Sequence, residues 1–493
     1  GGYSYGDGRI GGISLKHLSG PGCAAYQDFP LMPSTAPLAG SPAKPNGTGL
    51  AERHTAAFSH RSERASPGYY AVKLAPGGGG TVRTRLTATT RSGLVSLRFP
   101  RRGPRQVLFN ASGAAMGTSE ASVRIDPRRR EVSGTATSGQ FCYQGNRYTL
   151  HFVARFDRAF ASHGTWTRDE LQPGSAAAAD SIPGPPFVAQ PTPGNPDVER
   201  GSGSTARAGA YVRFRAGRRR DVEARIGISF VSVEGARRNL AESRGRSFER
   251  VRADARARWS RMLGRIRVSG GSRRDRRVFY TQLYHALLHP STFSDADRRY
   301  TGFDGRVRRL RRGARYADFS GWDTYRTQMP LLAMIAPRRA SDMVRSLLAA
   351  ARESGYLPKW SQANGHTHVM VGDPAAPLIA GAWAFGARRF DRAAALAALI
   401  KGATEYGKAS TSPDYYQRAG LPPYLALGYV PHELNTDGIT QTFFPERVWG
   451  SVSTSLEYAL ADFAIARLAG SACRRSVYAQ FMARSGNWRR LFD

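Results

Sequence analysis

The chain has 493 residues and a formal net charge of +35, with 72 Lys and Arg against 37 Asp and Glu. That length predicts two or three domains, and a hydrophobic content of 41% excludes a wholly disordered chain. No apolar run reaches the roughly 18 residues that a membrane-spanning helix needs, so the sequence predicts no membrane span.

The charge excess alone would favour an anionic partner such as nucleic acid. The Arg residues are scattered along the whole chain, however, and basic runs such as 128–130 and 306–312 lack interleaved aromatic side chains. Few Lys together with many Ala and Gly indicate the coding bias of a GC-rich genome. We therefore expect no nucleic-acid partner, and a role as a binder of anionic polymers rests on charge alone.

Residues 1–233 have the pattern of a β-sandwich domain. Short alternating runs at 82–89, 94–99, 148–156 and 210–214 are separated by Gly, Pro and Ser clusters, as in sandwiches. Residues 170–203 are rich in Pro, Gly and Ala, which predicts a long exposed loop.

Residues 234–270 are expected to form a helical linker, and residues 271–493 a helical domain. Apolar residues recur at helical spacing over 278–288, 321–335, 338–353, 377–385, 391–400, 452–468 and 475–483. Strands followed by helices predict an all-β domain and then an all-α domain.

The densest polar segment of the helical half is residues 356–373. It carries Trp360, Asn364, His366, His368 and Asp373. The Trp face suits a sugar ring, and the two His lie two residues apart, so they face one side of an extended segment. The segment predicts a sugar or phosphate site in which a His serves as acid, base or donor. The alternatives are a metal site, or a simple connection in which Asp373 caps the next helix.

Two other segments carry candidate binding residues. Trp322 and Asp323 open a predicted helix, where they either line the mouth of a pocket or belong to the core. His432 and Glu433 lie in an aromatic loop and are either contacts to substrate hydroxyls or solvated side chains. The Asp-rich segment 293–304 lacks the bidentate Glu of a calcium loop and is interpreted as a turn.

The cysteines are Cys23, Cys142 and Cys473. Three cysteines allow one bridge but define no disulfide framework. No leader precedes Gly1, which leaves the location of the protein open.

Several segments, in order, resemble glycoside hydrolase family 92. They are residues 12–23 (GISLKHLSGPGC), 139–142 (GQFC), 227–232 (GISFVS), 279–288 (FYTQLYHALL), 321–326 (GWDTYR), 357–360 (LPKW), 452–459 (VSTSLEYA) and 487–493 (NWRRLFD). The resemblance spans nearly the whole chain.

Members of that family are mostly secreted, calcium-dependent exo-α-mannosidases that invert the anomeric configuration. The resemblance implies a β-sandwich, a helical linker and an (α/α)6 barrel. It also implies removal of terminal α-mannose from glycans, calcium as cofactor, and a secreted or cell-surface location of bacterial type. The linkage, the calcium ligands and the oligomeric state are not implied.

The chain departs from the family pattern at two places. The family's general acid is a Glu in the loop after the LPKW-like motif, and His366 stands at that position here. This departure implies a His acid, or a phosphate leaving group that needs no acid and is contacted by His366, or a glycan binder without activity. The family's base carboxylates lie downstream of residue 493. We therefore interpret the chain as a fragment with a truncated barrel that lacks part of the site. We expect this fragment to be poorly soluble on its own.

The resulting hypothesis is an inverting α-mannosidase whose sugar pocket lies between the two domains. His17 reaches the pocket from the sandwich, and His366 has a catalytic role. The other expected substrate contacts are Trp322, Asp323, Trp360, Asn364, His432 and Glu433. The alternative is a non-catalytic glycan-binding relative.

Overall fold

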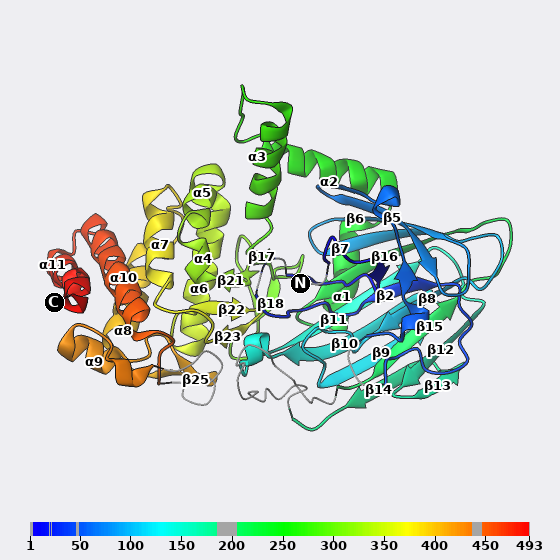
Figure 1. Ribbon diagram of the computed structural model, residues 1–493, viewed down its shortest axis with the longest axis horizontal. Helices are drawn as coiled ribbons and strands as arrows, with labels where there is room; N and C mark the ends of the chain where they lie inside the picture. Colours follow the sequence, from blue (N-terminus) through cyan, green and yellow to red (C-terminus); the bar gives the residue numbers. More distant parts are fainter. Residues whose placement is uncertain are drawn as a thin grey trace.

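The computed structural model describes residues 3–18, 20, 22–45, 49–184, 205–435 and 446–492. Figure 1 shows an elongated molecule with strands at one end, helices at the other, and the N-terminus near the middle. The predicted order, a β-sandwich followed by a helical domain, is confirmed.

The β-domain consists of two antiparallel sheets that share one hydrophobic core. The larger sheet contains β1 (Arg9–Ile10), β3 (Ala56–Ala57), β4 (Arg64–Ser66), β5 (Tyr69–Pro76), β6 (Val82–Ala88), β7 (Ser92–Arg98), β9 (Glu120–Asp126), β10 (Glu131–Gly139), β11 (Arg147–Phe156), β14 (Ala177–Ser181) and β16 (Asp221–Ser229). The smaller sheet contains β2 (Leu31–Ser34), β8 (Gln106–Asn110), β12 (Ser162–Thr167), β13 (Glu170–Pro173) and β15 (Ala208–Arg213). Phe109 of one sheet stacks on Phe152 of the other at 5.5 Å, which joins the two layers.

The prediction of a long loop over 170–203 is wrong for its first part. Residues 170–173 form β13 and pair with β12, and residues 177–181 form β14 and pair with β9. The turn at Gly174, which has a positive φ of 80°, sends the chain from one sheet to the other. Ala-rich edge strands have low intrinsic β propensity, so their ladder partners decide the conformation. Residues 185–204 lie outside the described part of the chain.

Helices follow the last strand of the sandwich along the chain. These are α1 (Val233–Asn239), the short 3-10 helix η4 (Leu240–Ser243), α2 (Phe248–Leu263) and α3 (Arg273–Ala286). The α1 helix packs on β11 and β16, and α2 packs on β5 and β6. A capping box between Ser272 and Asp275 begins α3, which stands away from both domains in Figure 1.

The helical domain contains α4 (Gly321–Thr324), α5 (Gln328–Ile335), α6 (Pro337–Ser354), α7 (Ala375–Ala384), α8 (Arg392–Thr404), α9 (Leu421–Leu427), α10 (Ser451–Ser471) and α11 (Arg475–Arg484), with 3-10 turns η5 (His432–Leu434) and η7 (Ser485–Leu491). Neighbouring helices share a core of Leu, Ile, Met and Ala side chains. None of the described helices is long and apolar enough to cross a membrane.

Short strands that the sequence did not predict lie at the junction and on the helical side. They are β17 (Ser291–Thr292), β18 (Arg299–Thr301), β19 (Val307–Arg309), β20 (Tyr316–Ala317), β21 (Phe319–Ser320), β22 (Trp360–Gln362), β23 (Gly365–Thr367), β24 (Lys408–Ala409) and β25 (Ser412–Tyr416). The 3-10 turn η3 (Phe141–Tyr143) meets them from the sandwich, where a disulfide joins Cys23 to Cys142. Cys473 is free and exposed.

Candidate functional site

The β22–β23 hairpin holds Trp360 and His366 on opposite faces. Trp360 pairs with Thr367, and Ser361 pairs with His366, so Trp360 and His366 differ by one step of the side-chain alternation. Trp360 is buried and stacks on Phe141 of the sandwich at 4.1 Å. Trp360 therefore joins the two domains, while His366 faces the helical domain.

His366 is buried among helical-domain side chains. Its Nε2 lies 2.7 Å from the Ser354 hydroxyl at the end of α6, and its ring stacks on Tyr415 at 4.0 Å. Burial lowers the pKa of His366 to about 3, so the ring is neutral near pH 7. A neutral ring can donate or accept a hydrogen bond, but it has no imidazolium proton to give a leaving group.

Lys359 and His368 surround the same tyrosine. The rings of His366 and His368 both contact Tyr415, as expected for two residues on one side of an extended segment. Lys359 is 4% exposed, and burial lowers the pKa of its ammonium to about 8. The pKa of His368 is also low, because of burial and then the nearby Lys359 charge.

Asp373 ends the loop in a buried ionic network. Its carboxylate accepts hydrogen bonds from Gln417 and from Arg418, whose Nε lies 2.8 Å from Oδ2. The same Arg418 contacts Asp462 of α10 at 2.8 Å, and Arg484 also pairs with Asp462. The alternative in which the Asp373 side chain caps α7 is wrong, because the N-cap is Pro374 and no side chain caps the helix. We call Lys359, His366, His368, Asp373, Tyr415, Gln417 and Arg418 the polar layer.

Trp322 and Asp323 lie beside this loop. The backbone N–H of Gly321 donates to the Lys359 carbonyl at 3.1 Å, which fixes the start of α4 against the loop. Asp323 is exposed, whereas Trp322 is half-buried beneath the Arg326 guanidinium at 3.9 Å.

Glu457 of α10 was not among the predicted site residues. It accepts hydrogen bonds from the Tyr325 hydroxyl and from Arg326, both at 3.0 Å. A side chain at Gly372 would lie 2.4 Å from the Glu457 Cβ, so Glu457 lies directly against the loop. Glu457 belongs to the segment 452–459 (VSTSLEYA). That segment supports the family resemblance, but its sequence alone does not indicate a site residue.

The remaining predicted contacts are dispersed. Asn364 donates to the Gly302 carbonyl at 3.1 Å, which ties down the tip of the hairpin. His432 and Glu433 are exposed on η5, where the His432 ring contacts Asn435 at 2.9 Å. His17 is exposed on a sandwich loop, where it forms an isolated β-bridge with Tyr26.

Asp318 is a second residue that sequence reasoning missed. Its buried carboxylate binds Lys16 at 2.8 Å, accepts from the Tyr26 hydroxyl at 2.5 Å and accepts from the Ala363 backbone N–H at 3.1 Å. Despite burial, the Lys16 charge and these hydrogen bonds keep its pKa low. Asp318 thus holds the sandwich loop against the loop that carries the polar layer.

Buried nitrogen atoms without hydrogen-bond partners gather around this loop. Among the described residues they are Trp322 Nε1, Gln362 Nε2, His366 Nδ1, His368 Nε2 and Arg418 Nη2. Buried polar atoms are nearly always paired, so each such group calls for an explanation, and a bound polar ligand or water supplies one.

The part of the chain that the structure describes contains no group of three or more His, Cys, Asp and Glu side chains placed to hold a metal ion. The interpretation of the Asp-rich segment as a turn is confirmed only in part, because residues 299–301 form β18 between turns. Arg308 donates to both oxygens of Asp304 at 2.6 Å. The described residues therefore do not supply a calcium site.

The described chain thus has a β-sandwich and a helical domain, with the polar layer on the helical side of their junction. The glycosyl hydrolase family 92 N-terminal domain matches residues 1–229, and the family 92 catalytic domain matches residues 235–493. The chain therefore belongs to glycosyl hydrolase family 92.

Solved and curated relatives agree with this assignment. An inverting family GH92 mannosidase from Bacteroides thetaiotaomicron is 26% identical with a TM-score of 0.81, covering 100% of this chain and 59% of its own. An α-mannosidase of the same bacterium, in complex with mannoimidazole, is 26% identical with a TM-score of 0.81, covering 100% and 58%. An uncharacterized secreted glycosidase of Arthroderma benhamiae is 23% identical, covering 100% and 57%. The chain thus spans less than three fifths of the length of these relatives.

Proposed function

We propose that the protein is a glycoside hydrolase that removes terminal α-linked mannose from glycans with inversion. Family membership and the likeness to two mannosidases support this function. The observation that carries it is the set of four unpartnered buried nitrogens that belong to Trp322, His366, His368 and Arg418. Sugar hydroxyls accept and donate hydrogen bonds, so a bound sugar satisfies such nitrogens.

Inversion requires one carboxyl group as acid and another as base, separated widely enough to admit a water molecule. We propose that Glu457 contacts the substrate, because Tyr325 and Arg326 fix its carboxylate against the loop. We assign no base among the described residues.

The role proposed for His366 is that of a neutral hydrogen-bonding group. Its pKa of about 3 does not suit a proton donor near neutral pH. A phosphate leaving group needs no proton, so the site favours mannose-1-phospho linkages. The full-length protein should then cleave mannose-1-phospho-6-mannose faster than α-1,2-mannobiose. Cleavage of the mannobiose alone would defeat this specificity, though not the mannosidase function.

A second candidate function is glycan binding without catalysis. It is favoured by one observation, the neutral buried His366 at the position where the family carries an acidic Glu. Proton NMR of the full-length protein with both substrates separates the two functions. Release of mannose, first as the β-anomer, supports the inverting hydrolase. Saturable binding without release supports the binder, and neither binding nor release contradicts both.

We also propose that the protein is secreted. A disulfide between Cys23 and Cys142 forms in oxidising surroundings, and a curated relative is described as secreted. Non-reducing mass spectrometry of the protein from its native source tests this proposal, since two free thiols at these positions would oppose it.

A further inference from the structure

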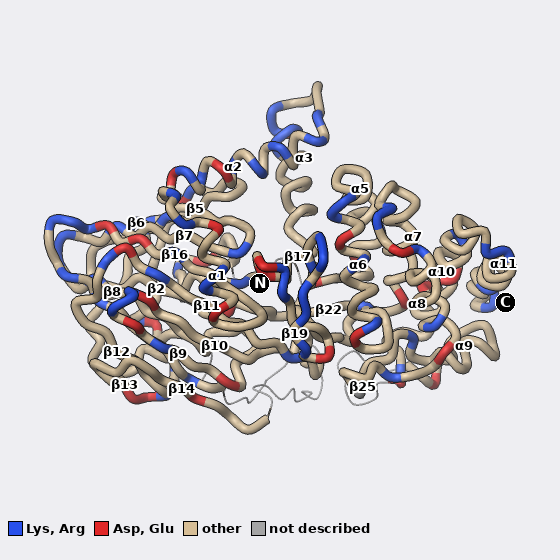
Figure 2. The backbone as a smooth tube through the Cα atoms, turned by 180° about the vertical axis from the view of Figure 1, so that it is seen from behind, with Lys and Arg blue, Asp and Glu red and all other residues tan. Residues whose placement is uncertain are grey.

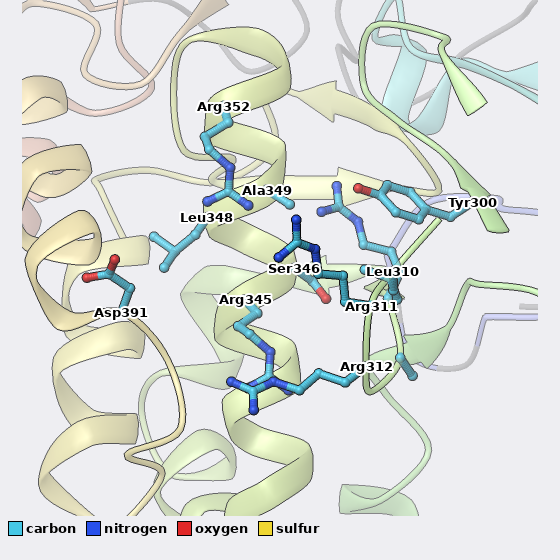
Figure 3. A pocket seen from close by; sticks show the side chains of 12 residues that line it. Tyr300, Leu310, Arg311, Arg312, Arg345, Ser346, Leu348, Ala349, Arg352 and Asp391 are labelled. Atoms are coloured by element: carbon cyan, nitrogen blue, oxygen red, sulfur yellow. The ribbon is translucent and has the colours of Figure 1, made fainter. Parts of the chain in front are cut away.

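A cavity of about 600 Å³ lies against α6, on a different part of the helix from the Ser354 contact to His366. Figure 3 shows Arg311 and Arg312 reaching toward α6, which presents Arg345 and Arg352. The lining consists of Tyr300, Leu310, Arg311, Arg312, Ala314, Arg315, Arg345, Ser346, Leu348, Ala349, Arg352 and Asp391. Figure 2 shows Lys and Arg spread over both domains, so charge alone does not single out this place. The cavity and the buried Arg315 in its lining do.

Five arginines line this cavity, and two of them have a carboxylate partner: Arg315 pairs with Glu353, and Arg345 with Asp342. Within the described residues, the side chains of Arg311, Arg312 and Arg352 have no hydrogen bond or ion pair to a carboxylate. The Asp391 carboxylate accepts from the Ala394 backbone N–H at 2.9 Å, because it caps α8.

A buried guanidinium also points to a missing partner. Arg315 is 3% exposed, and its Nη2 donates to Glu353 at 3.0 Å. Its Nη1 is buried and has no hydrogen-bond partner among the described residues. An unpaired N–H of a buried cation is costly, and an oxyanion in the adjacent cavity would satisfy it.

Mutual repulsion within the cluster gives the same indication. Burial, followed by the charges of Arg312 and Arg389, lowers the pKa of Arg345. Burial also lowers the pKa of Arg315, and the charge of Arg352 lowers it further. An anion placed among these groups would replace repulsion by attraction.

We propose that this cavity binds a small phosphorylated ligand of sugar-phosphate size through its phosphate group. Planar guanidinium groups match the oxygens of phosphate, and several converge here. The volume lies within the range of sites for small organic molecules, and Leu310 and Leu348 add an apolar wall. The proposal does not rest on the mannosidase function, because its residues are separate from the polar layer.

Calorimetric titration of the full-length protein with glucose 6-phosphate, inorganic phosphate and glucose tests the proposal. We expect saturable binding of glucose 6-phosphate at one site and no binding of glucose there. Replacing Arg311, Arg312 and Arg352 by Ser should weaken binding by about tenfold or more. Equally tight binding of inorganic phosphate would assign the site to the free ion and still support an oxyanion site.

The matched control replaces Arg256, Arg258 and Arg261 by Ser. These residues are exposed on α2, and their replacement removes the same total charge far from the cavity. The control should bind glucose 6-phosphate as the parent does. The proposal is overturned if the parent binds neither phosphate compound saturably, or if the control loses as much affinity as the cavity variant.

Discussion

The Ser354 hydroxyl and the His366 Nε2 lie 2.7 Å apart, and this contact anchors the β22–β23 hairpin to the end of α6. Both groups are buried, so the imidazole is held in one orientation with Nδ1 left without a partner. The geometry leaves Nδ1 as the atom of His366 that can contact a ligand.

Lowering the pH should destabilise the protein through His366. Its folded pKa is about 3 against an ordinary 6.5, so the unfolded chain binds the proton first as pH falls. The contribution of His366 to the free energy of unfolding is therefore fully present above about pH 6.5 and declines toward pH 3. In urea unfolding between pH 7.5 and 4.5, His366→Gln should show a shallower decline than the parent.

The exposed variant His432→Gln is the control for this titration, and its decline should match that of the parent. Asp28 contributes an opposite slope, because burial raises its pKa to about 7 and its stabilisation is lost as pH rises from 3.8 to that value. The difference between parent and variant isolates His366. Identical slopes in parent and His366→Gln would contradict the buried neutral ring.

Breaking the Asp373–Arg418 contact should be severe. Both side chains are fully buried, and Asp373→Asn leaves a buried guanidinium with one carboxylate fewer. We expect a loss of about 3–5 kcal/mol in the free energy of unfolding, measured with urea. Glu120→Gln, which removes a largely exposed partner of Arg147, should cost about 1 kcal/mol or less. Equal costs would show that the network is not buried as described.

Removing the disulfide should destabilise the sandwich. The bridge closes a separation of 119 residues, so replacing Cys23 and Cys142 by Ala should cost about 3–5 kcal/mol. A thermal melt measures this as a lower Tm, and Cys473→Ala, at the exposed free thiol, should leave Tm unchanged. An unchanged Tm in the double variant would contradict a structural role for the bridge.

Lys359→Met should separate binding from stability. The ammonium is buried and its pKa is lowered to about 8, so an apolar side chain of similar length removes a desolvation cost. We expect unchanged or higher stability in urea, together with mannoside affinity reduced by about tenfold. Full mannoside affinity in this variant would exclude Lys359 from the site.

The fold was largely predictable from the sequence because periodicity reports burial. The helices at 338–353 and 452–468 and the strands at 82–89 and 148–156 all carry alternating or helical patterns, and each is present. The Ala-rich strand β14 was not predictable, because its pairing with β9 is a long-range contact.

The candidate site was predictable only as a segment. Sequence chemistry indicated residues 356–373, but the face on which each side chain lies depends on strand register. One step of register places Trp360 against Phe141 and His366 against Ser354. Glu457 and Asp318 join the loop from distant parts of the chain, which no local pattern reveals.

A crystal structure of the full-length protein with mannoimidazole would locate the sugar site. We expect the sugar ring beside Trp322 and the 356–373 loop, with its hydroxyls within hydrogen-bond distance of one or more of the unpartnered nitrogens. Mannoimidazole bound elsewhere, with Trp322 Nε1 and His366 Nδ1 still unpaired, would contradict this expectation.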